Sequence, residues 1–307
     1  MPDTMTERTT WWDAQPDTRR VSNGSKALRE HLAEHGLDFQ VATEPVTIRG
    51  AESDTWRAVV RQDTGDVYGV VRGRYEPVQH ADALQVVDDV CDGWDARLDS
   101  LTPLNGGLAL VAACQYKRPV DVGGADTATP WLLFSTSHDG KQSIRVGLTM
   151  VQLSCTNQIP GALGGGSSVS IVHSSQSMSR LAEASRAMDR MDSLIDAWEQ
   201  DAGALAHKEL TEARCRNIVE KCVARHATSL KQVSEDTDSI VALFSDSPTM
   251  PERFRGTAFG AVHAATEHFQ HVRQWRAPVT LAREMTTGRA GRTVRDIVAR
   301  CTDARRR

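Results

Sequence analysis

The feature that most constrains this chain is a change of residue pattern at a glycine-rich loop. Before the loop, short apolar and β-branched runs alternate with turn residues, which is typical of antiparallel strands. After about Ser174, apolar residues recur every three or four positions, as on one face of a helix. We therefore predict an α+β fold, with a mainly antiparallel sheet in the N-terminal half followed by a helical C-terminal half.

The same patterns set the expected boundaries. Residues 1–22 are expected to form a flexible leader, residues 23–298 a single α+β domain, and residues 299–307 a basic tail. Within the domain, the sheet-rich part is expected at 37–160 and the helical part at 174–298. A chain of 307 residues with 40% hydrophobic residues can bury a core of this size.

Individual elements follow from local signals. A first helix is expected in SKALREHLAEHG, ending at Gly36, and a second over 80–100. Turn residues at 63–66 and 138–140 predict two β-hairpins, and the glycine-rich stretch after the turn at Asn157 is expected to form a mobile crossover into the helical half. The later segments with helical periodicity are SMSRLAEASRAMDRMDSLIDAWEQDAGAL, TEARCRNIVEKCVARH, ERFRGTAFGAVHAATEHFQHVRQW and TVRDIVARCTDARRR.

The cysteines and the hydropathy pattern indicate the compartment. The six cysteines form no Cys-x-x-Cys pair, and we expect reduced, mostly buried thiols. No apolar run approaches the roughly 18 residues of a membrane span, and the polar first residues do not resemble an export signal. A cytoplasmic protein with no membrane partner is therefore expected.

Cys155 and His173 flank the glycine loop and suggest a thiol nucleophile with its base. Asn157 or Glu267 would orient the pair if the fold brought them together. The alternative is that Cys155 is a buried strand residue and that Asn157 turns the chain. We favour this alternative, because sequence distance alone cannot make a triad. The adjacent Ser137, His138 and Asp139 are interpreted as a hairpin turn.

Glu267 and His271 stand four residues apart, and His263 precedes Glu267 by the same step, so all three could share one helical face. Two or three side chains on one helix form a metal site only when other ligands arrive from elsewhere. An ion pair that supports the helix is the simpler interpretation, and we expect no cofactor. GALGGGSS lacks the Lys and Ser/Thr of a P-loop, which disfavours nucleotide hydrolysis.

The clearest charge signal lies at the C-terminus. From Arg273 to Arg307 there are ten arginines and three acidic residues, a net charge of +7 on a chain whose formal net charge is -4. Arginine forks bind phosphates in a bidentate manner. We predict nucleic-acid contacts through Arg289, Arg292 and Arg295. A solvated helix end is the alternative. A second basic surface is expected on the strands, at Arg72, Arg74, Lys141 and Arg145.

Three ordered motifs resemble one known family. LLFSTSHDGKQSIRVGLTMVQLSCTNQI resembles the hairpin and Cys-x-Asn signature of the phage/plasmid-like family of uncharacterised proteins, the domain of unknown function 932. RGTAFGAVHAATEHFQHVR resembles its late helix, and DVYGVVRGRYEPVQHADAL its early pattern. Phe259 replaces a usual Trp and His263 a usual Asn. The positions that match the family pattern are Asp139, Gly140, Cys155, Asn157, His173, Gly256, Thr257, Glu267 and His271.

The resemblance implies a context rather than an activity. Such proteins occur in phages, plasmids and transferred islands, where recombination and replication of DNA are common tasks. We therefore expect a DNA-binding accessory protein, with single-stranded DNA as a better ligand than double-stranded DNA, that could form a homo-oligomer. The alternatives are a thiol- or metal-dependent enzyme using Cys155, His173, Glu267 and His271, and an inhibitor of host defence. Of these, we favour a protein without enzymatic activity.

Overall fold

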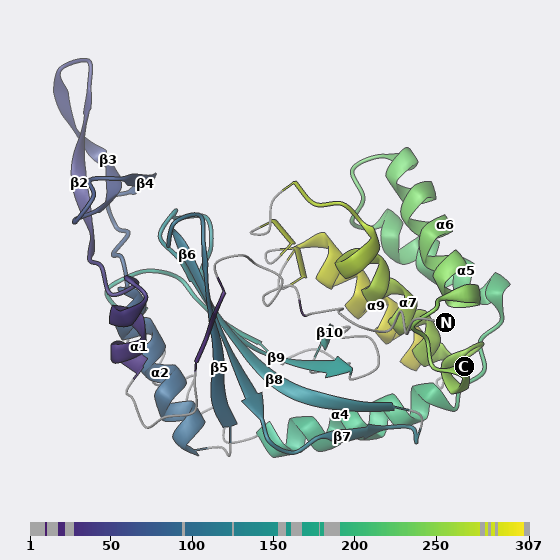
Figure 1. The fold of residues 1–307 in the computed structure, drawn as a ribbon. Coiled ribbons are helices and arrows are strands. Elements are labelled where there is room, and N and C mark those ends of the chain that lie inside the picture. The colour runs from purple at the N-terminus through teal and green to yellow at the C-terminus, as the bar shows by residue number, and fades with distance from the viewer. Residues whose placement is uncertain are drawn as a thin grey trace, which may run out of the picture.

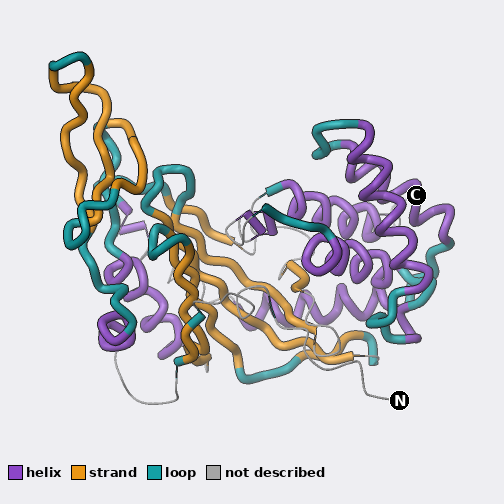
Figure 2. The backbone as a smooth tube through the Cα atoms, turned by 45° about the horizontal axis from the view of Figure 1, so that its top comes forward, coloured by secondary structure: helices purple, strands orange, loops and turns teal. Residues whose placement is uncertain are grey.

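The chain folds into a curved sheet, a block of helices at one end of it and a projecting hairpin sheet at the other (Figures 1 and 2). The computed structural model describes residues 10, 18–21, 28–93, 96–124, 126–152, 158–160, 168–177, 179–180, 191–276, 280–281, 284–285 and 288–303. The predicted α+β class is confirmed. Within these ranges, no helix has the length and apolar character that a membrane span requires.

The main sheet has eight strands in the order β1–β5–β6–β8–β9–β10, with β7 paired to β8 and β11 paired to β9. All of these pairings are antiparallel. The strands are β1 (Arg19–Arg20), β5 (Ala96–Leu104), β6 (Ala109–Tyr116), β7 (Val120–Val122), β8 (Asp126–Ser137), β9 (Ile144–Gln152), β10 (Gln158–Pro160) and β11 (Ser168–Ile171).

The central strands β6 and β8 are buried on both faces, which explains their nearly continuous apolar sequences. On one face, Leu132 and Phe134 join the main core. On the other face, Trp131 and Leu133 form a smaller cluster against which Leu281 packs. Helix α2 (His80–Gly93) contacts β5, β6 and β8 and contributes to the main core.

A separate three-stranded antiparallel sheet, here called the arm, consists of β2 (Val41–Ile48), β3 (Ala51–Arg61) and β4 (Val67–Arg72). The predicted turn at 63–66 joins β3 to β4. Figures 1 and 2 show the arm extending away from the main sheet. Its base packs on the body through Val59 and Val71, which are buried in the main core.

The helical half follows the strands. Besides α2, the helices are α1 (Leu28–Glu34), α4 (Met191–Ala206), α5 (Glu212–Ala224), α6 (Leu230–Asp246), η2 (Glu252–Phe254), α7 (Ala258–Glu267), the π-helical turn η3 (His268–Val272) and α9 (Arg289–Asp303). The side chains of Thr211, Ser229 and Thr257 cap the first turns of α5, α6 and α7. Helix α9 contacts α5, α7 and β10, so it closes the helical block against the sheet.

Several elements differ from the sequence-based expectations. The helix expected over 80–100 ends at Gly93, and Ala96 begins β5. Helix α6 was not predicted, because its SEDTDS run is as polar as a loop. Residues 168–171, expected in a mobile crossover, pair with β9. Arg19 and Arg20 of the expected leader pair with β5, and α9 extends to Asp303 in the expected tail.

The arm meets the body at three buried histidines, here called the histidine cluster: His80, His138 and His173. The ring centroids of His80 and His138 lie 4.2 Å apart, His138 stacks on Tyr68 at 6.2 Å, and His173 stacks on Tyr75 at 5.2 Å. Neither ring nitrogen of His138 has a hydrogen-bond partner. Burial lowers the pKa of His80 to about 4, of His138 to about 2 and of His173 to about 4.

The predicted hairpin turn at 138–140 forms the other side of this joint. Asp139 Oδ1 accepts hydrogen bonds from Ser137 Oγ at 2.8 Å and from the Lys141 backbone N–H at 2.9 Å, so its carboxylate fixes its own turn. Gly140 has φ +70°, and a Cβ there would lie 2.4 Å from Val71 Cγ1. The hairpin therefore needs glycine both for its backbone and for the close approach of the arm.

The histidine cluster predicts that the protein loses stability in mild acid. Its pKa values are lower in the folded state than the ordinary value of 6.5, so the unfolded chain binds more protons as the pH falls from about 6.5 toward about 4. Each histidine then lowers the free energy of unfolding by up to about 1.4 kcal/mol for each unit by which the pH falls. His138→Phe keeps an aromatic ring beside Tyr68 and should flatten this dependence in urea unfolding at pH 7, 6 and 5.

The control is a substitution of the exposed His207, which should leave the wild-type pH dependence unchanged. An equal pH dependence in wild type and His138→Phe would show that His138 does not contribute to the acid sensitivity.

Candidate nucleic-acid interface

Helix α9 carries Arg289, Arg292 and Arg295, the arginines predicted to contact nucleic acid. The packing of the helix on its neighbours determines where these side chains point. Its apolar side joins the main core through Val294, Ile297 and Val298. Its first turn is capped by Glu284, whose Oε2 accepts hydrogen bonds from the backbone N–H of Arg289 at 2.7 Å and of Ala290 at 3.4 Å. The helix is therefore anchored on its apolar side and at its N-terminus.

The charge of Arg295 in α9 acts on Arg145 of β9, although 150 positions separate them in the sequence. Burial lowers the pKa of Arg145, and the positive charge of Arg295 lowers it further. Burial also lowers the pKa of Arg295, followed by the charge of Arg292. Neither the Arg145 nor the Arg295 side chain forms a hydrogen bond or ion pair in the described part of the chain. Two partly buried guanidinium groups thus repel each other. The nearby Asp296, whose charge raises the pKa of Arg295, already pairs with Arg225 and His226.

The strand register places hydroxyl groups on both sides of Arg145. Ser135 of β8 and Ser170 of β11 lie opposite it on the neighbouring strands. Ser170 Oγ lies 2.6 Å from Ser143 Oγ, and Ser170 is exposed. This strip of the sheet face is small, polar and cationic, so it offers donors to an anion and little steric obstruction.

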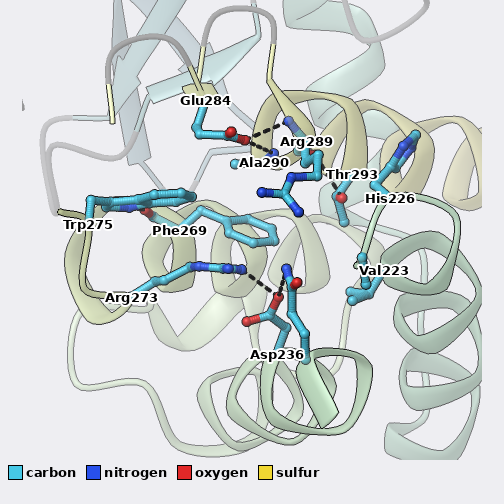
Figure 3. Close-up of a pocket in the computed structure, with 12 residues that line it drawn as sticks. Val223, His226, Asp236, Phe269, Arg273, Trp275, Glu284, Arg289, Ala290 and Thr293 are labelled. Carbon is cyan, nitrogen blue, oxygen red and sulfur yellow. Dashed lines mark hydrogen bonds and ion pairs between the residues drawn. The ribbon is translucent and has the colours of Figure 1, made fainter. Parts of the chain in front are cut away.

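A narrow pocket opens beside the first turn of α9 (Figure 3). The guanidinium of Arg289 points into this pocket, and its Nη1 is buried without a hydrogen-bond partner. On the facing wall, the guanidinium carbon of Arg273 lies 4.8 Å from the ring centroid of Trp275. The pocket residues are Val223, His226, Ala227, Gln232, Asp236, Phe269, Arg273, Trp275, Glu284, Arg289, Ala290 and Thr293.

Asp236 organises the floor of the pocket. It accepts hydrogen bonds from Arg273 Nη1 at 2.6 Å, from His268 Nε2 at 3.1 Å and from Gln232 Nε2 at 3.3 Å. Burial alone would raise the pKa of Asp236, but the hydrogen bond from His268 and the charge of Arg273 hold it below its usual value. Arg273 is therefore neutralised, whereas Arg289 is not paired at its Nη1.

The predicted basic residues fall into two groups. Arg145, Arg289, Arg292 and Arg295 belong to α9 and the sheet face beside it. Arg72 and Arg74 lie at the end of β4 in the arm, where the Arg72 guanidinium stands 5.9 Å from the Trp56 ring centroid. Lys141 lies in the hairpin loop that contacts the arm. The structure therefore does not unite all of them in one surface.

The residues considered for catalysis also separate. Cys155 and Asn157 lie outside the described residues. His173 is buried in the histidine cluster, where its Nδ1 accepts a hydrogen bond from the Val78 backbone N–H at 3.4 Å. Glu267 is buried in the helical block, where it accepts a 2.5 Å hydrogen bond from Ser247 Oγ and lies 3.6 Å from His263 Nε2.

The metal hypothesis finds no geometric support in these ranges. Among the described residues, no group of three or more His, Cys, Asp or Glu side chains could hold a metal ion. His271 belongs to the π-helical turn η3, so its spacing of four from Glu267 crosses a change in helical repeat. An α-helical wheel therefore does not describe their relative direction.

The described cysteines fit the expectation of reduced, buried thiols. Cys114, Cys215, Cys222 and Cys301 are free and buried. Burial raises the pKa of Cys215 to about 12, and of Cys222 and Cys301 to about 11. These three thiols are protonated at neutral pH and are poor nucleophiles.

Comparison with known proteins identifies a family. The family described as "Domain of unknown function (DUF932)" matches residues 67–295, which include the pocket, most of the main sheet and α9 as far as Arg295. No curated protein and no solved structure matches the chain.

The geometry of Asp236 predicts a large effect of removing its charge. Asp236→Asn leaves Arg273 and His268 beside a neutral amide, and we expect the free energy of unfolding to fall by about 2 kcal/mol. Asp238→Asn is the matched control on the same helix, because Asp238 is exposed and pairs with Arg216 at the surface. Chemical unfolding of both variants should show a clear loss for the first and little change for the second. Equal losses would contradict the structural role given to Asp236.

Proposed function

The chain belongs to the DUF932 family, and we propose that it binds nucleic acid through α9 and the adjacent face of the main sheet, with single-stranded DNA as its ligand. The proposed context is an accessory protein of a phage, plasmid or other mobile element, acting in recombination or replication. The family description names no activity, so the proposal rests on the site itself.

The observation that carries the proposal is a set of partly buried arginines. Arg145 lies between Ser135 and Ser170 on the sheet. On α9 lie Arg295 and Arg289, and Nη1 of Arg289 is buried without a hydrogen-bond partner. Two partly buried like charges destabilise the folded protein unless an anion lies between or beside them. A phosphate would accept hydrogen bonds from both guanidinium groups and relieve their repulsion. Binding would also be favoured by the entropy of the counterions that the nucleic acid releases. Arg292, which is exposed on the same helix, extends the positive surface beyond this pair.

The aromatic group beside these arginines favours a single strand. Trp275 is partly exposed at the edge of the pocket, and its indole N–H is already engaged by the Phe269 carbonyl at 2.8 Å. Arg273 lies over one side of the ring and the ring packs against the core, so the exposed remainder of the ring is the part on which an unpaired base would stack. In a duplex the bases are stacked on each other. The phosphates of a duplex would therefore contact the arginines, but its bases would not stack on the tryptophan.

The test measures binding of a labelled single strand by fluorescence anisotropy over a series of salt concentrations. An oligonucleotide of about 20 nucleotides covers the site sizes found for single-strand binding domains. Arg145→Gln combined with Arg295→Gln should weaken binding and reduce the slope of log K against log salt by about 1.4, or about 0.7 for each lost phosphate contact. A duplex of the same sequence should bind more weakly.

Arg118→Gln provides the matched control. Arg118 is an exposed arginine paired with Asp196 at 2.6 Å and lies outside the proposed site. Its loss removes one formal charge, as each of the two site substitutions does, so a nonspecific charge effect of Arg118→Gln would equal that of one site substitution. The proposal fails if micromolar protein does not bind the strand at about 50 mM salt, or if Arg118→Gln reduces the salt slope as much as one site substitution does.

A further inference from the structure

The arm exposes an unusual amount of apolar surface. Seven large apolar side chains are exposed among the described residues, and four of them belong to the arm. Their exposed fractions are Ile48 51%, Trp56 39%, Val67 62% and Val70 54%. Since single exposed apolar residues are common but clusters are not, the arm has the composition of an interaction surface.

The strand register shows which of these residues share a face. On the inward face, Val59 and Val71 are buried against the body. On the opposite face, Glu44, Ala58 and Val70 form one row across the three strands, and Trp56 and Arg72 form the next. The outward face is thus apolar along its middle, with a carboxylate on edge strand β2 and a guanidinium on edge strand β4.

The charge of the arm argues against nucleic acid as its occupant. Residues 41–74 contain five arginines and five acidic residues, so their formal net charge is zero. Two of those arginines already pair within the arm, Arg57 with Glu52 at 3.2 Å and Arg61 with Asp63 at 2.7 Å. A polyanion would meet as many carboxylates as guanidinium groups, which gives no net electrostatic attraction.

We propose that the outward face of the arm binds the same face of a second copy of this chain. A two-fold axis parallel to the strands places β2 of one copy opposite β4 of the other. Glu44 of each copy then approaches Arg72 of its partner, while Trp56, Ala58 and Val70 pack together in the middle. The surface is therefore complementary to itself both in charge and in apolar character.

The projection of the arm makes this contact sterically accessible. In both ribbon views the arm stands clear of the main sheet and of the helical block (Figures 1 and 2). This projection is compatible with the approach of a second arm. The same geometry leaves α9 and the pocket uncovered, so the self-association is independent of the proposed nucleic-acid binding.

Sedimentation velocity of the full chain, over a concentration series without nucleic acid, tests the proposal. We expect a concentration-dependent dimer. Val70→Asp should weaken the dimer more than about tenfold, because it places a charge in the apolar middle. Glu44→Arg and Arg72→Glu should each weaken it by about fivefold or more, and the combination of both should restore it, because the charge pair is then re-formed in reverse.

Leu230→Asp is the matched control, since Leu230 is an apolar residue of α6 that is 89% exposed outside the arm. It should leave dimerisation unchanged, and circular dichroism should show that every variant is folded. A monomeric wild type up to about 100 μM would overturn the proposal. So would charge reversals that fail to rescue each other, or self-association that occurs only after an oligonucleotide is added. The salt-slope experiment on Arg145 and Arg295 is unaffected by these outcomes.

Discussion

The structure depends on the burial of strand β8 on both of its faces. Its central residues Trp131, Leu132, Leu133 and Phe134 are all buried, two of them in each cluster of the core. Such a strand has to be covered from both sides, which requires α2 on one face and the segment containing Leu281 on the other. The C-terminal end of β8 leads into His138 and hence to the arm. The turn after β8 therefore joins Val59 and Val71 of the arm and the other two histidines in connecting the arm to the body.

The sequence predicted the individual strands and helices better than the tertiary contacts between them. Alternation, turn residues and caps are local signals, and they identified the arm's hairpin at 63–66, the turn at 138–140 and the helical periodicity of α5 and α9. Two of the missed elements are β5 and α6. The Asp92-Gly93 pair that ends α2 is a turn signal that the helix expected over 80–100 passes over. Helix α6 passes through a polar run whose buried residues are visible only in the packed structure.

The same difference between local signals and tertiary contacts applies to the residues of the candidate site. Counting charges was sufficient to select Arg289, Arg292 and Arg295, because a local excess of arginine is a property of the sequence. The effect of the Arg295 charge on Arg145 was not predictable, since it depends on how α9 lies against the sheet. The ion pair of Asp236 and Arg273 was missed for the same reason, because the carboxylate is on α6 and the guanidinium follows η3. Arg273 was among the arginines counted from the sequence, but nothing in its residue type or spacing indicated that it pairs with Asp236.

The boundary of the family match crosses the arm. It begins at Val67, the first residue of β4, so β2 and β3 lie outside the matched residues. Within the arm β4 pairs only with β3, and without that partner it would be an unpaired strand edge. A relative that lacks β2 and β3 would have to supply another strand to β4 or shield its backbone. Of the outward face, Val70 and Arg72 lie within the shared region, whereas Glu44, Trp56 and Ala58 lie before it. The two halves of this face can therefore diverge at different rates, and association between copies could be gained or lost among relatives while the core of the domain stays the same.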